Sequence, residues 1–226
     1  MTNVYIIGSG KLANELLKAL NFDKKYRVIP WADRHPEDVA AILVHAGSGR
    51  ELNQAISYCQ QTNSSLIELS TDVDHQQDHL NIPVVLCPNT NILMLKFMNI
   101  LEKSGKNFSQ YQINITESHQ ASKTSLPGTA VALATSLNIP SHRIESVRDI
   151  QKQQSEFGIP EKNLARHAYH RIEISDNDAC SITLETRVLG DSPYVGGVKD
   201  IIMAVDEHSL EKRVYQVMEF IDNQWI

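Results

Sequence analysis

The sequence has few cysteines, no run of basic residues and no long apolar stretch, and each absence excludes a class of protein. Cys59, Cys87 and Cys180 form no CxxC pair, which argues against a disulfide scaffold or a cysteine-rich zinc site and favours a reducing compartment. The 21 basic and 27 acidic residues give a net charge of −6, without the clustered positive face that nucleic acids or anionic membranes require. The longest apolar runs, such as residues 39–44, have the length of strands, and the first ten residues lack the basic region of a signal peptide. We therefore expect a soluble cytoplasmic protein.

What the chain does contain is typical of a globular protein. Its 226 residues are 42% apolar and 21% charged, enough to bury the core of one large domain or two ordinary ones. There is no internal repeat and no low-complexity segment.

The first ninety residues alternate short apolar runs with amphipathic segments. Apolar spacing predicts helices over 11–20 and 51–61. Strands are expected over 4–7, 26–31, 41–45, 66–69 and 84–87. Continuous apolar strands that alternate with helices indicate a parallel sheet covered on both faces, as in a Rossmann-like α/β fold.

The regular alternation of strands and helices ends after Pro88. A long helix is expected over 91–103, a shorter one over 128–137 and a last one over 211–221, while the polar segment 151–162 is interpreted as a loop. Strands are expected over 111–116, 170–175 and 180–188. Two consecutive strands without a helix between them favour an antiparallel or mixed sheet, so the second half should be α+β.

A glycine-rich turn follows the first strand directly. Gly8 permits the tight turn, Gly10 lets the backbone approach a pyrophosphate, and Ala13 allows the helix to pack closely on the strand. The amides at the start of the helix then face the phosphates. This pattern predicts a dinucleotide site formed by Gly8, Ser9, Gly10, Lys11 and Leu12.

An acidic residue lies at the end of the second expected strand. Asp33, twenty positions after Ala13, could accept hydrogen bonds from an adenosine ribose, whereas Arg34 beside it suits a 2′-phosphate. NADH and NADPH therefore both remain open as the cofactor, and a solvated surface pair is the alternative.

A second motif, ESHQASKTSLPGTA over 117–130, joins a strand to a helix start. His119 and Lys123 lie four apart in a loop, so an imidazole that gives a proton and an ammonium that stabilises negative charge could face one pocket. Pro127, Gly128 and Thr129 form an uncrowded helix start that suits a carboxylate. On composition alone, a surface loop with an ordinary helix start is the simpler interpretation.

This segment resembles the His-His-x-x-Lys-x-Asp-Ala-Pro-Ser-Gly-Thr-Ala signature of the 4-hydroxy-tetrahydrodipicolinate reductase family, NAD(P)H-dependent enzymes of bacterial lysine (diaminopimelate) biosynthesis. Segment 82–91 is similar to the family's strand and Pro-Asn turn, and His170 with 194–198 to its later histidine and helix start. The terminal segment 213–221 falls where the family's chain returns to the nucleotide domain.

The resemblance implies roles for particular residues. His119 would donate a proton, Lys123 would stabilise developing charge, and Gly128 with Thr129 would hold a substrate carboxylate. Gln120 and His170 would border the small-molecule substrate, and Ser70 and Asn89 the cofactor. The dinucleotide domain would comprise residues 1–90 and 205–226, with an inserted substrate and oligomerisation domain over 91–204 that forms tetramers.

Three departures from the family pattern keep other functions open. Gln120 replaces the family's second histidine, the loop before Gly128 is one residue shorter, and Glu68 begins the stretch that matches the family's Gly-Thr-Thr-Gly loop near the nicotinamide. A divergent reductase of another small cyclic carboxylated imine or enone is one alternative. A dinucleotide-binding sensor without turnover is the other.

Other histidines have simpler interpretations. His75 and His79, beside Asp72, Asp74 and Asp78, could present a metal-binding face, but a solvated polar turn is favoured and no metal is expected. His45 follows a strand at the edge where open α/β sheets bind ligands, and a satisfied buried histidine is an equal alternative. The loop 47–50 is equally open as a cofactor contact or an ordinary helix start.

Overall fold

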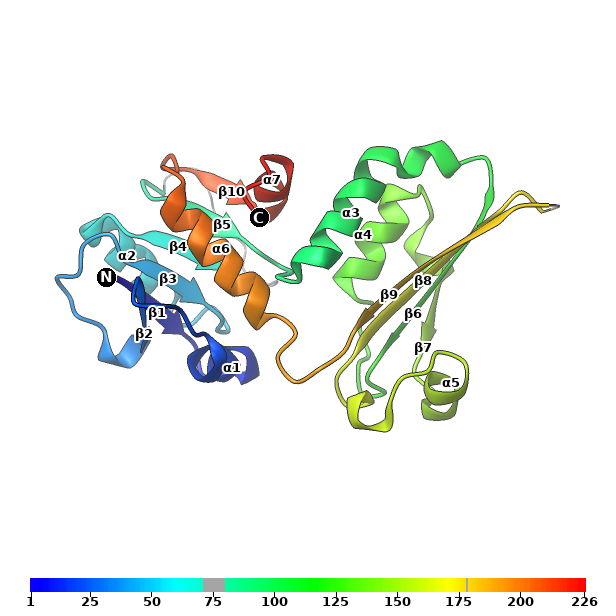
Figure 1. The fold of residues 1–226 in the computed structure, drawn as a ribbon, viewed down its shortest axis with the longest axis horizontal. Coiled ribbons are helices and arrows are strands. Elements are labelled where there is room, and N and C mark those ends of the chain that lie inside the picture. Colours follow the sequence, from blue (N-terminus) through cyan, green and yellow to red (C-terminus); the bar gives the residue numbers. More distant parts are fainter. Residues whose placement is uncertain (71–79, 178) are drawn as a thin grey trace. The chain divides into compact units, whose positions relative to one another are not determined.

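The computed structural model describes residues 1–70, 80–177 and 179–226 (Figure 1). It comprises two compact units, the first made of Met1–Ile92 with Tyr194–Ile226 and the second of Leu93–Pro193. The first unit is therefore built from both ends of the chain, and the second is inserted between them. The possible metal face at His75 and His79, with its three aspartates, lies outside the described residues.

The first unit contains a six-stranded sheet in the order β10-β5-β4-β3-β1-β2, in which every neighbouring pair is parallel. Its strands are β1 (Thr2–Ile7), β2 (Tyr26–Pro30), β3 (Ile42–His45), β4 (Ser65–Glu68), β5 (Val84–Leu86) and β10 (Val214–Gln216). From β1 the chain passes to β2 on one side and then to β3 on the other, so the strand order reverses between β1 and β3. Ligands of open α/β sheets bind at such a switch point, and the Rossmann-like prediction is confirmed.

Helices cover both faces of this sheet, because Val4, Tyr5, Ile6 and Ile7 are all buried although successive side chains point to opposite faces. The helices are α1 (Lys11–Ala19), α2 (Leu52–Thr62), α6 (Val195–Glu207) and α7 (Val217–Asp222). On one face, the rings of Tyr5, Trp31 and Tyr58 meet edge to face, with centroids 5.4–6.2 Å apart.

The second unit contains a four-stranded sheet in the order β7-β6-β8-β9. Its elements are α3 (Ile92–Ser104), β6 (Gln112–His119), α4 (Gly128–Ser136), β7 (Ile144–Val147), α5 (Ile150–Ser155), β8 (Ala168–Ser175) and β9 (Ser181–Val188). Strands β6, β8 and β9 are antiparallel and β7 runs parallel to β6, so the expected mixed sheet is confirmed. Ile113 and Ile115 of β6 pack with α3 and α4, while Val147 and Tyr169 pack on Phe157 on the other face.

Two sequence expectations are wrong. The segment 151–162 is not a continuous loop, because Asp149 accepts a hydrogen bond from the Lys152 amide at 2.8 Å and caps α5. The segment 211–221 is not one helix, because Val214–Gln216 pair with β5 and α7 starts only at the capping box of Gln216 and Glu219 (Figure 1, red).

Helix α6 approaches the backbone before α3 too closely for any side chain at Gly197. A Cβ atom there would lie 1.6 Å from the carbonyl oxygen of Thr90. We expect Gly197→Ala to lower the free energy of unfolding by about 3 kcal/mol, because the helix must shift. Thermal unfolding by circular dichroism measures this, with Gly196→Ala, which meets nothing within 4 Å, as the control. Equal melting temperatures for the two variants would contradict the packing described.

The helix lengths, the cysteines and the potential metal ligands of the described residues bear on three sequence expectations. Within the three described ranges, no helix is long and apolar enough to cross a bilayer. Cys59 and Cys87 are buried, and burial raises the pKa of the Cys59 thiol to about 12, while Cys180 is exposed. No group of three or more potential metal-ligand side chains occurs among the described residues.

Candidate active site

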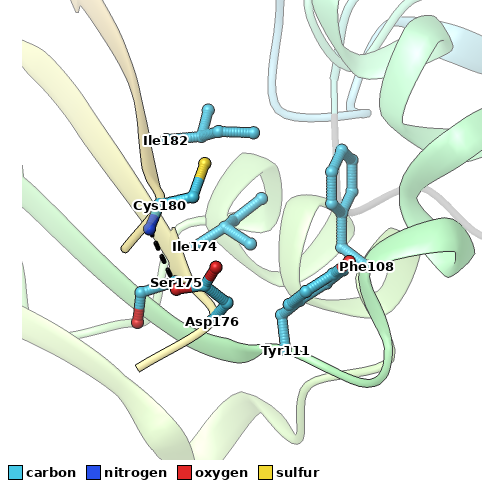
Figure 2. Close-up of a pocket in the computed structure, with 7 residues that line it drawn as sticks. All are labelled: Phe108, Tyr111, Ile174, Ser175, Asp176, Cys180 and Ile182. Atoms are coloured by element: carbon cyan, nitrogen blue, oxygen red, sulfur yellow. Dashed lines mark hydrogen bonds between the residues drawn. The ribbon is translucent and has the colours of Figure 1, made fainter. Parts of the chain in front are cut away.

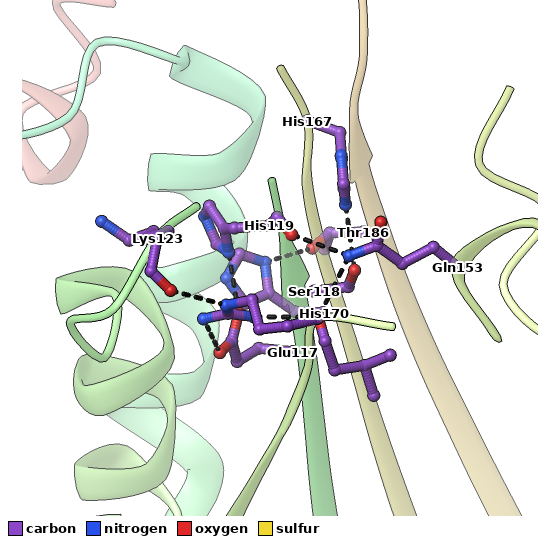
Figure 3. Close-up of polar contacts among 10 residues, drawn as sticks. Glu117, Ser118, His119, Lys123, Gln153, His167, His170 and Thr186 are labelled. Carbon is purple, nitrogen blue, oxygen red and sulfur yellow. Dashed lines mark hydrogen bonds and ion pairs between the residues drawn. The ribbon is translucent and has the colours of Figure 1, made fainter. Parts of the chain in front are cut away.

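Polar side chains replace the apolar core at the end of β6. Glu117 and His119 follow Ile113 and Ile115 at alternate positions, so all four share one face of the strand. The antiparallel register sets His170 opposite Glu117. Figure 3 shows Glu117, His119 and His170 grouped at this end of the sheet, beside the loop of Lys123.

Glu117 is fully buried and has two side-chain partners, Arg148 and His119. Arg148 donates from Nη2 to Oε1 at 2.6 Å and from Nη1 to Oε2 at 3.2 Å. The Nδ1 atom of His119 lies 2.8 Å from Oε2. Burial alone would raise the pKa of Glu117, but the hydrogen bonds from His119 and Arg148 outweigh it and lower the pKa to about 2. The carboxylate is thus ionised at neutral pH and fixes the Nδ1 proton of His119, which leaves Nε2 for exchange with a ligand.

The segment after β7 holds the backbone of both candidate catalytic residues. Arg148 donates its Nε proton to the carbonyl oxygen of Lys123 at 3.0 Å. Gln153 of α5, fully buried, donates to the carbonyl oxygen of His119 at 2.8 Å (Figure 3). Arg148 therefore links the position of the Lys123 loop to the carboxylate that orients the His119 ring.

Two further histidines surround His119 and stay neutral. Burial and the nearby His119 lower the pKa of His170 to about 4, and burial lowers that of His167. The Nδ1 atom of His170 lies 3.1 Å from Thr186 Oγ1, and the Nε2 atom of His167 lies 2.9 Å from Ser118 Oγ. Their ring centroids are 5.8 and 6.5 Å from that of His119. Nε2 of His170 is buried and has no hydrogen-bond partner in the described part of the chain.

The loop after His119 leads to an open helix start. Gln120 and Lys123 are half-buried, and the Lys123 amide donates to the Gln120 carbonyl at 2.9 Å. Helix α4 has no side-chain cap at Pro127, and a Cβ atom at Gly128 would meet nothing within 4 Å. The first amides of α4, with half-buried Thr129, are accordingly suited to an anion.

In the first unit, the glycine turn has the form that a dinucleotide needs. Gly8 has φ of +124°, and a Cβ atom there would lie 2.8 Å from the Ala46 carbonyl oxygen. Gly10 precedes α1, which has no side-chain cap, and the space beside Gly10 is open. Ser9 and Lys11 are exposed and Leu12 is half-buried. The chain therefore offers a backbone cradle that can approach a pyrophosphate.

At the end of β2, Asp33 and Arg34 are exposed. The Arg34 guanidinium stacks 4.0 Å from the centre of the Trp31 ring and donates to the Trp31 carbonyl at 3.0 Å. Trp31 and Arg34 line an open groove of about 490 Å³ together with Tyr58. The groove therefore lies next to Asp33 and Arg34, the residues expected to contact the adenosine part of the dinucleotide.

The remaining predicted cofactor residues are engaged in local hydrogen bonds. The Ser70 amide donates to Glu68 Oε1 at 2.8 Å, and Asn89 Oδ1 accepts from the Asn91 amide at 2.9 Å. Glu68 itself is buried against His45 and does not face solvent.

A second cavity, of about 150 Å³, lies at the far end of β8 (Figure 2). Ile174, which lines it, pairs with Ile113 at the opposite end of β6 from His119. Phe108 and Tyr111 line the cavity as well, and Asp176 is tied to the Cys180 amide at 3.0 Å. It therefore lies apart from the histidine cluster.

Sequence reasoning assigned no role to Glu117, Arg148, Gln153 or His167. The sequence does indicate a role for Glu117, because it alternates with two isoleucines expected to be buried, and a carboxylate on that face needs a partner. No local sequence pattern indicates a role for Arg148 or Gln153, because only the pairing of β6 with β7 brings them to the motif.

Comparison with known proteins finds relatives among the 4-hydroxy-tetrahydrodipicolinate reductases. The probable 4-hydroxy-tetrahydrodipicolinate reductase 1, chloroplastic, of Oryza sativa subsp. japonica is 28% identical over 156 residues, 62% of this chain and 45% of that protein. The Arabidopsis thaliana 4-hydroxy-tetrahydrodipicolinate reductase 1 is 25% identical over 157 residues, 64% and 45% of the two chains. The chain thus spans about half the length of these curated relatives.

Among solved structures, the dipicolinate-bound dihydrodipicolinate reductase from Paenisporosarcina sp. TG-14 has the same fold. It superposes with a TM-score of 0.66 over 96% of this chain and 97% of its own, at 16% identity. The family model described as dihydrodipicolinate reductase, C-terminus, matches residues 93–221, which include the whole histidine cluster, α6 and β10. Since this match takes in more than half of the chain, the protein belongs to the dihydrodipicolinate reductase family.

Proposed function

We propose that the protein is an NAD(P)H-dependent reductase of 4-hydroxy-tetrahydrodipicolinate in lysine (diaminopimelate) biosynthesis. The observation that carries this proposal is the buried Glu117–Arg148 pair, which orients His119 and fixes the Lys123 loop at once. A surface loop with an ordinary helix start would need neither contact. The substrate in this proposal is taken from the names of the relatives.

We assign the dinucleotide to the first unit. The turn from Gly8 to Leu12 would hold the pyrophosphate, and Ser70 and Asn89 would border the nicotinamide half. Asp33 suits the ribose of NADH and Arg34 the 2′-phosphate of NADPH. When bound, the reduced cofactor supplies a hydride.

We assign the substrate to the second unit. An imidazolium at His119, hydrogen-bonded through Nδ1 to Glu117, presents its Nε2 proton for donation. Lys123 stabilises negative charge that develops on the substrate, and the amides of Gly128 and Thr129 hold a carboxylate. Gln120 and the neutral His170 supply hydrogen bonds without charge.

One observation favours a second candidate, a reductase of another small cyclic carboxylated imine or enone. Gln120 is half-buried next to His119, so the substrate would meet an amide where the family signature has a second histidine. A neutral amide holds an anionic substrate less strongly than an imidazolium does. We propose a cytoplasmic location from the cysteine content, and a homo-oligomer, a tetramer by family resemblance.

The test is a coupled assay in which the substrate is generated in the cuvette and oxidation of NADH and NADPH is followed by the loss of their ultraviolet absorbance. We expect turnover with at least one nucleotide, and we expect Lys123→Met to lose most of it while dinucleotide affinity stays unchanged. Tight dinucleotide binding without turnover of this substrate, but with turnover of a related cyclic imine, would favour the second candidate. Binding without turnover of any imine or enone would favour a sensor.

A further inference from the structure

A buried histidine–glutamate pair joins the ends of β3 and β4 in the first unit. His45 and Glu68 are opposite in the parallel register, and both side chains are fully buried. The Nδ1 atom of His45 lies 2.8 Å from Glu68 Oε1. The same oxygen accepts the Ser70 amide at 2.8 Å, so Glu68 fixes both the ring and the start of the following loop.

Three polar atoms of this group lack hydrogen-bond partners. The Nε2 atom of His45, the Oγ atom of Ser70 and the second carboxylate oxygen of Glu68, Oε2, are buried and have no hydrogen-bond partner among the residues that the structure describes. Leaving a buried polar atom unpaired costs about 1–3 kcal/mol, so a native protein rarely keeps several together without a use for them. The histidine that the sequence left undecided is thus satisfied on one nitrogen only.

The unpaired nitrogen lies beside Gly47, which packs next to the glycine turn. A Cβ atom at Gly47 would be 3.0 Å from His45 Nε2, 3.4 Å from Glu51 Oε2 and 3.5 Å from the Cα atom of Gly8. Because the strand order reverses between β1 and β3, a dinucleotide that places its pyrophosphate at β1 and its adenosine towards β2 must extend its other half towards β3 and β4. His45 and Ser70 lie at the carboxyl ends of those two strands or directly after them.

We propose that His45 Nε2 and Ser70 Oγ bind the carboxamide of the nicotinamide ring, an inference that rests on the proposed dinucleotide binding. We take the neutral ring with its proton on Nδ1, towards Glu68; Nε2 is then an acceptor that suits the carboxamide NH₂, and the Ser70 hydroxyl is a donor that suits its carbonyl. Glu68 is a positioning residue that holds the tautomer. This pairing also explains how an acidic residue is accommodated near the cofactor: the carboxylate faces His45 and not the ligand.

Calorimetric titration with two ligands tests the proposal. NADH carries the carboxamide, whereas ADP-ribose ends before the nicotinamide ring; NADPH and 2′-phospho-ADP-ribose form the second pair. We expect His45→Phe/Glu68→Gln to weaken NADH or NADPH binding about tenfold and Ser70→Ala about threefold, with the affinity for the truncated ligand unchanged. The double variant strands no buried charge and leaves an acceptor for the Ser70 amide. Ser65→Ala, at the opposite end of β4, is the matched control.

The possible outcomes separate the two proposals. Equal loss of affinity for the full and truncated ligands, or no loss for either, would overturn the carboxamide assignment while dinucleotide binding stands. If the double variant does not fold, Ser70→Ala alone decides, because it removes one hydroxyl and keeps the backbone contact to Glu68. A wild-type chain that binds neither ligand would overturn the proposed dinucleotide binding, and this assignment with it.

Discussion

Replacing His119 by glutamine should lower the turnover number of the reductase by about a hundred- to ten-thousand-fold, the usual contribution of a positioned proton donor. Glutamine keeps a polar side chain of similar reach but has no proton to give in this pH range. Since the substitution leaves the glycine turn and the other proposed cofactor residues unchanged, the dissociation constant for NADH or NADPH should not change. Steady-state kinetics and calorimetry measure the two quantities.

The matched control is His142→Gln, at an exposed histidine in the turn before β7. It should retain full turnover. An undiminished rate in His119→Gln would remove the proton donor from the proposal, and a parallel loss of dinucleotide affinity would show that the substitution acts on more than the proton.

Replacing Arg148 by methionine should lower the stability of the second unit. The change removes the partner that binds both oxygens of the fully buried Glu117 carboxylate. This costs about 3 kcal/mol of unfolding free energy at pH 7, at the lower end for such pairs because Arg148 is partly exposed. Urea unfolding at several pH values measures the loss. Arg143→Met, an exposed arginine five positions earlier, should change stability by less than about 0.5 kcal/mol.

The loss of stability in Arg148→Met should depend on pH. In the native protein the pKa of Glu117 is lowered from 4.5 to about 2, so the ionised group stabilises the fold above pH 4.5 and that contribution disappears as the pH falls towards 2. Without Arg148, its lowering effect on the pKa of Glu117 is lost while burial still raises that pKa, so the carboxylate takes up a proton at a higher pH and acidification relieves its unpaired charge. The stability gap between wild type and Arg148→Met should therefore narrow from pH 7 to pH 3. A gap that is constant with pH would show that the loss comes from packing and not from the carboxylate.

Much of the fold follows from local pattern. The apolar runs at residues 4–7 and 41–45 predict buried parallel strands because a strand covered on both faces has no polar side, and β1 and β3 fall where expected. The glycine turn is equally local, since the positive φ of Gly8 and the close approach of Ala46 exclude any other residue. The loop of His119 and Lys123 was found by its motif, and its family by resemblance.

The rest depends on contacts distant in sequence. Helix α5 has no apolar stripe, because its one buried residue is Gln153. The Gln153 side chain is buried because it donates hydrogen bonds to the carbonyl oxygens of His119 and Val147. Strand β10 has three residues, too few for a period, and exists because β5 offers it a free edge. Arg148 joins the site only through the parallel pairing of β6 with β7, 31 positions after Glu117. No local pattern encodes these pairings.

The division of the first unit between both ends of the chain has a consequence for synthesis. The ribosome releases β1 to β5 long before α6 and β10. Until these two elements emerge, the parallel sheet has one unpaired edge and a partly uncovered face. The second unit is continuous from Leu93 to Pro193 and can fold as soon as it leaves the exit tunnel. The usual order of amino-terminal domain first is thereby reversed, and the exposed strands of the nascent sheet are where a chaperone would be needed.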